Sequence, residues 1–164
     1  MQILDDERCW KAFNSWYNDA GKLGQTKGWE EVERQISHAP KMTHIEQIAF
    51  FMLKKYETRE GWQVDFQKQI GKYRVDFLVQ GQFSSIKGNQ KCLEMCQIVV
   101  ECDGHDFHEK TKEQAIYDKK RDRDLQSLGF RVYRFTGSEI WRTDGICILK
   151  SLNAFLLEED GGIV

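Results

Sequence analysis

The chain contains one proline, no long hydrophobic run and no excess of positive charge. With 40% hydrophobic and 30% charged residues, its composition is typical of a globular protein and excludes a disordered one. No stretch has the apolar length needed to cross a bilayer, and the acidic N-terminus lacks the apolar core of a signal peptide. We therefore expect one folded domain, residues 1–164, in the cytoplasm and without a membrane partner.

Cysteine usage and net charge exclude two further classes of protein. Five cysteines are an odd number, and a chain of this length can build a core without disulfides, so a disulfide-framework protein is excluded. The formal net charge of −2 excludes a protein that coats nucleic acid, since nonspecific affinity comes mainly from Lys and Arg. A local basic surface is still possible if acidic side chains gather elsewhere, so an enzyme remains compatible with this composition.

Hydrophobic residues at helical spacing predict three helices near the N-terminus. The first covers residues 5–20 and is expected to stop at Gly21 and Gly24, and the second covers residues 29–38 ahead of a proline. The third begins at Thr43, which together with Glu46 has the form of a capping box.

The hydrophobic pattern then changes to a period of two. It predicts strands over residues 62–70 and 73–80, joined by a tight turn at Gly71. A polar loop containing Gly81, Gly88 and Asn89 is expected to follow. Residues 95–104 then form an apolar run typical of a strand that is covered on both faces.

The last part of the chain predicts one more strand between two helices. A charged helix is expected over residues 111–128 with Gly129 at its end, followed by a strand over residues 130–135 and a helix over residues 144–157. This order of three helices, three strands, helix, strand and helix predicts an α/β (α+β) fold. The central sheet should be mixed and flanked by helices on both faces.

Carboxylates interrupt the predicted strands at two places. Asp76 lies inside the apolar run of residues 73–80, and Glu101 and Asp103 follow an apolar run of their own. Because side chains alternate along a strand, Glu101 and Asp103 share a face and Cys102 faces the other way. Two ionised carboxylates on neighbouring strands are costly unless a cation binds them, and oxygen ligands suit Mg²⁺ or Mn²⁺. The sequence therefore predicts a divalent-metal site at Asp76 and Glu101.

Each carboxylate also has a simpler explanation. Asp76 could pair with Arg74 or Lys72, and Asp103 could cap the turn at Gly104. A metal site is favoured because both strand-end carboxylates occur together.

Two other kinds of side chain are candidates for the same site. Glu46 is explained by the capping box alone, without any further function. His105 and His108 lie in the loop after the buried strand, where ligand-binding residues concentrate, and either could act as a general acid or base. His108 is the stronger candidate because it follows Glu101 and Asp103 closely in the sequence.

The helix over residues 111–128 carries basic residues that could contact nucleic-acid phosphates. These candidates are Lys112, Lys119, Lys120 and Arg123, joined by Arg131 and Arg134 on the strand that follows. Acidic residues are interleaved with them, so ion pairs along the helix could instead explain about half of the charges.

Four segments of the chain carry a family resemblance. They are Thr43-x-x-Glu46, Tyr73-Arg-Val-Asp76-Phe, Val100-Glu101-Cys-Asp103-Gly and Tyr117-Asp-Lys-Lys-Arg121-Asp-x-x-Leu125-x-x-x-Gly129-Phe-Arg-Val-Tyr-Arg-Phe135. This pattern resembles the restriction-endonuclease-like PD-(D/E)xK superfamily, and within it the branch similar to very-short-patch repair endonucleases. The resemblance implies an αβββαβ core over residues 43–141, preceded by a helical extension over residues 1–40 and followed by the helix over residues 144–157.

The resemblance also implies an activity and its ligands. The expected function is a Mg²⁺- or Mn²⁺-dependent endonuclease that hydrolyses DNA, with duplex DNA as partner and a homodimer as one possible assembly. The metal would be bound by Asp76, Glu101 and the main-chain carbonyl of Cys102. Glu46, on the first core helix, would supply a carboxylate to the metal or to its waters.

One position departs from the superfamily pattern. The superfamily's lysine would fall at position 103, where this chain has Asp103. His108 is then the candidate for proton transfer, with Lys110 or Lys112 as alternatives, while Asp103 and Glu46 orient metal-bound waters.

Two alternatives remain open at the level of sequence. The first is an inactive descendant of the nuclease fold that binds DNA or serves as an accessory protein. The second is a zinc-stabilised binding module, for which the chain offers soft and imidazole ligands. Those ligands are Cys92, Cys96, Cys102, His105 and His108.

Overall fold

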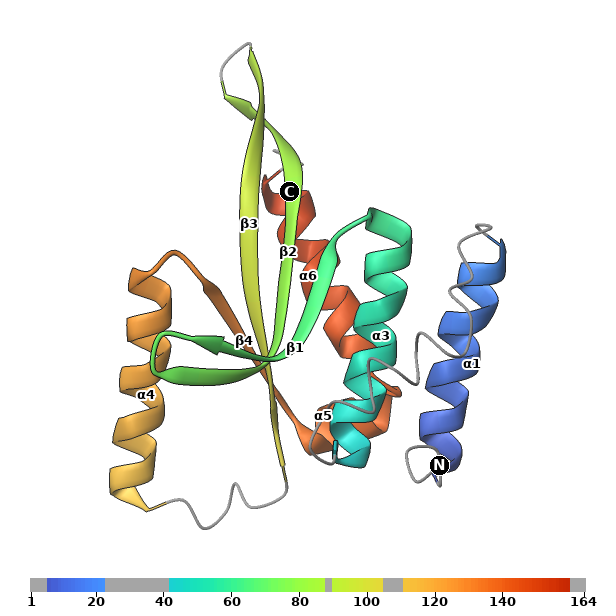
Figure 1. The fold of residues 1–164 in the computed structure, drawn as a ribbon, viewed down its shortest axis with the longest axis horizontal. Coiled ribbons are helices and arrows are strands. Elements are labelled where there is room, and N and C mark those ends of the chain that lie inside the picture. Colours follow the sequence, from blue (N-terminus) through green and yellow to red (C-terminus); the bar gives the residue numbers. More distant parts are fainter. Residues whose placement is uncertain (1–5, 23–41, 88–89, 105–110, 160–164) are drawn as a thin grey trace.

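Four strands form one mixed sheet in the order β1-β2-β3-β4 (Figure 1). They are β1 (Gln63–Ile70), β2 (Tyr73–Lys87), β3 (Gln90–Asp103) and β4 (Arg131–Thr136). Neighbouring strands are antiparallel from β1 to β3, whereas β3 and β4 are parallel. The structure is a computed structural model that describes residues 6–22, 42–87, 90–104 and 111–159.

Helices cover both faces of this sheet, which confirms the expected fold class (Figure 1). One face carries α3 (His44–Glu60), α5 (Gly137–Thr143) and α6 (Ile146–Glu159), with α1 (Glu7–Lys22) packed on the outside of α3. The other face carries α4 (Lys112–Ser127). None of the described helices combines the length and the apolar character required to traverse a bilayer.

The two faces enclose hydrophobic cores of different size. The larger lies between the sheet and α3, where Phe50, Phe51 and Leu53 are almost fully buried and Phe13 of α1 packs edge-on against Phe51. The smaller lies under α4, whose one buried residue among those described is Leu125. Leu125 packs α4 against the sheet, and the polar residues Arg121 and Asp122 of the same helix bind side chains of the sheet.

Strand β2 changes the face that it presents to the cores at Asp76. Val75 packs in the core under α4, whereas Phe77 packs in the core under α3. Residues two apart in a regular strand share a face, so the strand must twist sharply between them. The paired strand β1 shows the same irregularity, because Gln67 has a φ of 46° between the pairs Phe66–Phe77 and Lys68–Val75. Asp76 therefore lies at a bend of the sheet.

The turn and helix ends predicted from glycine are confirmed at two positions. Gly71 has a φ of 56° in the turn between β1 and β2, and Gly129 has a φ of 89° after α4. At Gly21 the predicted stop is wrong, because α1 continues to Lys22, and Gly24 lies outside the described residues. The helix predicted over residues 29–38 lies outside the described residues.

The predicted polar loop is wrong at Gly81, while Gly88 and Asn89 lie outside the described residues. Strands β2 and β3 instead continue as a paired ribbon in which Gly81 faces Cys96, and the ribbon projects beyond the rest of the sheet (Figure 1). Gly81 is required there by packing rather than by a turn. A Cβ atom added at this position would lie 2.1 Å from the Trp62 ring, so the indole fills the space that a side chain would need.

This contact makes Gly81→Ala a test of the ribbon. We expect the substitution to lower the free energy of unfolding by about 2–3 kcal/mol, because overpacking a buried ring forces it or the strand to move. Urea unfolding followed by tryptophan fluorescence would measure the loss. Gly104→Ala is the matched control, since a Cβ at Gly104 meets nothing within 4 Å. Equal stability of the two variants would contradict the proposed packing.

The single C-terminal helix predicted over residues 144–157 is also wrong in its beginning. A separate helix, α5, directly follows β4, and its start is fixed by a capping box between Thr136 and Glu139. Asp144 ends α5 in the left-handed conformation, with a φ of 49°, and α6 begins only at Ile146. Gly145 makes this corner possible, because a Cβ there would lie 2.6 Å from Met52.

Candidate functional site

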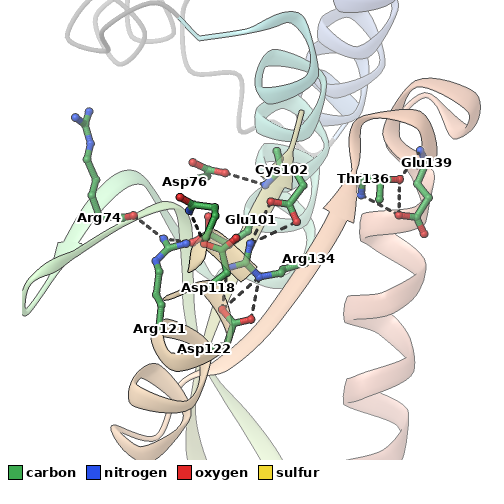
Figure 2. A network of polar contacts seen from close by, with 12 residues as sticks. Arg74, Asp76, Glu101, Cys102, Asp118, Arg121, Asp122, Arg134, Thr136 and Glu139 are labelled. Atoms are coloured by element: carbon green, nitrogen blue, oxygen red, sulfur yellow. Dashed lines mark hydrogen bonds and ion pairs between the residues drawn. The ribbon is translucent and has the colours of Figure 1, made fainter. Parts of the chain in front are cut away.

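Asp76 and Glu101 lie beside each other on neighbouring strands (Figure 2). The antiparallel pairing of Phe77 with Val100 sets this arrangement. It places Asp76, the residue before Phe77, opposite Glu101, the residue after Val100. Asp76 accepts a hydrogen bond of 2.8 Å from the main-chain N–H of Cys102. The structure thus brings together the two carboxylates that the sequence nominated, and the bend in β2 falls on one of them.

Both carboxylates resist ionisation in this position. The pKa of Glu101 is raised to about 7. Burial is the largest cause and the charge of Asp76 the next, while the charge of Arg121 opposes the shift. Burial also raises the pKa of Asp76, the Cys102 N–H lowers it, and the nearby charge of Glu46 raises it. Two neighbouring carboxyl groups whose pKa values are both raised, first of all by burial, form a site that a cation would stabilise.

Arg121 of α4 is the closest cation to Glu101. One guanidinium nitrogen, Nη2, donates to Glu101 Oε1 at 2.6 Å and to the Arg74 carbonyl oxygen at 2.6 Å. Arg121 points toward the sheet because Leu125, one helical turn later, is the residue that α4 buries. Sequence reasoning missed this role, although the spacing of Arg121 and Leu125 carried the signal.

Arg134 of β4 binds Asp103 and Asp122 and lies beside a third carboxylate, Glu101. The parallel register places it directly beside Glu101. Its Nη1 lies 3.1 Å from Asp103 Oδ1, while Nε and Nη2 donate to the two oxygens of Asp122 at 2.9 and 2.8 Å. Burial alone would lower the pKa of Arg134, but the hydrogen bonds and charges of Asp122 and Asp103 raise it. Asp103 is therefore an ion-pair partner rather than only a cap of the turn at Gly104.

Glu46 fulfils its predicted role in the capping box of α3. Its Oε2 accepts from the Thr43 N–H at 2.6 Å and from the Thr43 hydroxyl at 2.8 Å. The charge of this carboxylate nevertheless adds to the effect of burial in raising the pKa of Asp76. It also contributes to the raised pKa of the Cys102 thiol, after burial and the charge of Asp76. Glu46 thus lies close enough to the carboxylate pair for electrostatic coupling while it holds the helix start.

The cysteines do not assemble a zinc site within the described residues. Cys96 and Cys102 belong to the core under α3, on the opposite face of β3 from Val99 and the α4 side. No group of three or more His, Cys, Asp or Glu side chains is arranged as a metal site in the described part of the chain. His105 and His108 lie outside that part, and so does any test of the role predicted for His108.

The basic candidates on α4 are exposed but lie away from the carboxylates. Helical geometry places Lys112, Lys119 and Arg123 within about 40° of one another and about 180° from Arg121. Lys120 lies beside this stripe. Two acidic residues of α4 bind the sheet, Asp122 through Arg134 and Asp124 through Tyr73, whereas Asp118 accepts a hydrogen bond from Gln114 along the helix.

Comparison with known families supports a nuclease. Residues 52–156 match the family model REase_MTES_1575, which describes a restriction-endonuclease-like family. The chain belongs to this family. The matched segment contains Asp76, Glu101, Arg121 and Arg134 but begins after Glu46. Searches of curated proteins and of solved structures found no match.

Proposed function

We propose that this protein is a divalent-metal-dependent endonuclease that hydrolyses DNA phosphodiester bonds. The observation that carries the proposal is the pair of neighbouring carboxylates, the half-buried Asp76 and the buried Glu101, in a chain of the restriction-endonuclease-like family. The narrower resemblance to very-short-patch repair endonucleases stays part of the proposal. So do a cytoplasmic location and a homodimer that would place two sites on the two strands of a duplex.

The chemistry of the donor set fits Mg²⁺ or Mn²⁺. Asp76 and Glu101 offer carboxylate oxygens. Burial is the largest cause of the raised pKa values of these two groups, and a bound cation would stabilise their ionised forms. Asp76, Glu101 and the main-chain carbonyl of Cys102 would hold the cation, with Glu46 available to it or to its waters. When bound, such a cation supplies a Lewis acid for the phosphodiester and lowers the pKa of water.

The charged residues around the pair would act on the phosphate and its surroundings. Arg134 and Arg121 provide guanidinium groups next to Glu101, where they could stabilise negative charge that develops on the substrate. Asp103 fixes the orientation of Arg134 and in this proposal also orients water. His108 is the proposed group for proton transfer, as a residue whose ordinary pKa lies near neutrality.

The exposed stripe of Lys112, Lys119, Lys120 and Arg123 would contact the DNA backbone. Because the stripe faces away from Arg121, it would bind phosphates at a distance from the scissile bond. Such contacts fix the register of a duplex without reading its sequence.

A plasmid-nicking assay tests the proposed function. We expect supercoiled plasmid to be nicked in the presence of Mg²⁺ or Mn²⁺ and not in the presence of EDTA. Glu101→Ala should abolish nicking, since it removes one of the two central carboxylates. Glu113→Ala is the matched control, because Glu113 is an exposed residue in the first turn of α4 and should leave activity unchanged. Nicking that survives Glu101→Ala, or that needs no metal, would overturn the proposal.

The second candidate is a nuclease fold that binds DNA without cutting it. It is favoured by one observation, namely that Arg121 and Arg134 already counter the charges of Glu101 and Asp103. DNA binding without cleavage under any divalent metal would select this function. A stoichiometric zinc ion in the purified protein would instead support the zinc-stabilised module.

A further inference from the structure

A cavity of about 390 Å³ lies between the first turn of α3 and helix α5. It is lined by His44, Ile45, Ser138, Trp141 and Arg142. Its size falls within the range of pockets that hold small organic ligands, roughly 300–1,000 Å³.

The cavity opens at the same end of the sheet as the carboxylate site. Gly137 connects the two, because a Cβ at this glycine would lie 3.4 Å from the Asp103 carbonyl oxygen and 3.6 Å from Ile45. Ile45 in turn precedes Glu46, whose charge reaches Asp76. The beginning of α3, helix α5 and the end of β3 meet at this edge of the molecule (Figure 1). A ligand in the cavity would therefore lie beside a strand bound at Asp76 and Glu101.

Among the residues that the structure describes, the lining combines an aromatic ring with basic and hydrogen-bonding groups and contains no carboxylate. Arg8 fixes the ring, since its guanidinium lies 4.5 Å from the Trp141 ring centroid and donates to the Trp141 carbonyl oxygen. No hydrogen bond or ion pair engages the side chains of His44, Ser138 or Arg142 within the described residues. The cavity thus presents unused donors and positive charge next to a preset indole, which suits a planar anionic ligand.

We infer that this cavity binds one nucleotide of the substrate strand, with the base against Trp141 and a phosphate at Arg142 and His44. Stacking of a base on an aromatic side chain is favourable for every base, and arginine matches phosphate geometry. The inference rests on the proposed nuclease function and narrows its substrate. A base inside a duplex cannot reach a side cavity, so the preferred DNA carries an unpaired nucleotide beside the cleavage point, as at a bulge, a branch or a frayed end.

Binding measured without metal tests this inference independently of cleavage. Two fluorescein-labelled duplexes would be compared in EDTA, one fully paired and one identical except for a single unpaired adenosine. We expect the native protein to bind the second duplex more tightly. The combined variant His44→Ala with Arg142→Ala should lose about tenfold in affinity for the unpaired duplex and little for the paired one, as for lost hydrogen bonds from charged groups. Lys150→Ala, an exposed lysine of α6, is the matched control and should change neither affinity.

Trp141 gives a second readout that does not depend on a variant's stability. With ¹⁵N-labelled tryptophan, the indole N–H resonance of Trp141, assigned through Trp141→Phe, should shift on adding the unpaired duplex and stay in place with the paired one. Equal affinities for the two duplexes, or an unmoved Trp141 resonance, would overturn the inference. A preserved preference for the unpaired duplex in a protein that never cuts would overturn the nuclease function and leave the nucleotide subsite standing.

Discussion

Glu101→Gln is expected to stabilise the metal-free protein near pH 8 by about 3 kcal/mol, in contrast to most substitutions of a buried residue. The side chain is 5% exposed, and burial together with Asp76 raises its pKa to about 7 from an ordinary value of 4.5. Glutamine keeps an oxygen that can accept from Arg121 but carries no charge that must be buried. The same substitution should abolish nicking, so stability and activity would change in opposite directions.

The pH dependence of this gain has a defined sign. Below the ordinary pKa of 4.5 the carboxyl group is neutral in both the folded and the unfolded protein, and the substitution should have no effect. As the pH rises from 4.5 to about 7, the unfolded chain releases a proton that the folded protein retains, so native stability falls. Above that range the difference between the variant and the native protein is constant.

Urea unfolding at a series of pH values in EDTA would measure this difference. Glu113→Gln serves as the control, because that glutamate is exposed and its stability effect should be small at every pH. A Glu101→Gln protein that is less stable than the native protein near pH 8 would show that the ion pair with Arg121 outweighs the cost of burial. The strand-end acids would then be structural rather than poised for a cation.

The acids of the site were predictable because burial and charge conflict at the level of sequence. An aspartate inside an apolar strand is unusual wherever it occurs, and Asp76 could be recognised without any knowledge of the fold. The arginines were not predictable in this way. Arg121 and Arg134 are ordinary on a charged helix and on a short strand, and only the strand register and the burial of Leu125 bring them to Glu101.

The errors in the fold have a related cause. Glycine is common in turns, but Gly81 must be glycine because the ring of Trp62, the residue before β1, packs over it. The capping box of Thr136 and Glu139 is local and could have revealed α5, yet its position directly after a strand concealed it. The contact of Trp62 with Gly81 joins residues far apart in the sequence, so no pattern within a few residues could reveal it.

The register also gives meaning to the missing lysine. The resemblance to the PD-(D/E)xK superfamily places a lysine at position 103, and this chain has Asp103 there. In the structure Asp103 binds Arg134, which lies beside Glu101 on the neighbouring strand. Arg134 of β4 thus supplies a positive charge beside Glu101 in place of that lysine, and Asp103 together with Asp122 holds its guanidinium group in place.

Arg134→Met is therefore expected to lower the rate of plasmid nicking by about 100- to 1,000-fold, the size of effect seen when one charge-stabilising donor is removed from an active site. Lys150→Met, at an exposed lysine of α6, is the matched control and should cost little. Single-turnover rates at saturating metal and enzyme would separate this effect from weaker binding.

The double variant Asp103→Lys with Arg134→Met distinguishes a catalytic cation from a merely structural ion pair. Lysine at position 103 would return the positive charge to the strand that bears Glu101 and would still face Asp122. If the cation itself is what the reaction needs, the double variant should recover nicking to within about tenfold of the native rate while Arg134→Met alone does not. A double variant that folds as stably as the native protein and still fails to cut would assign Arg134 to the architecture of the sheet edge, and the cation for the phosphate would then have to come from Arg121.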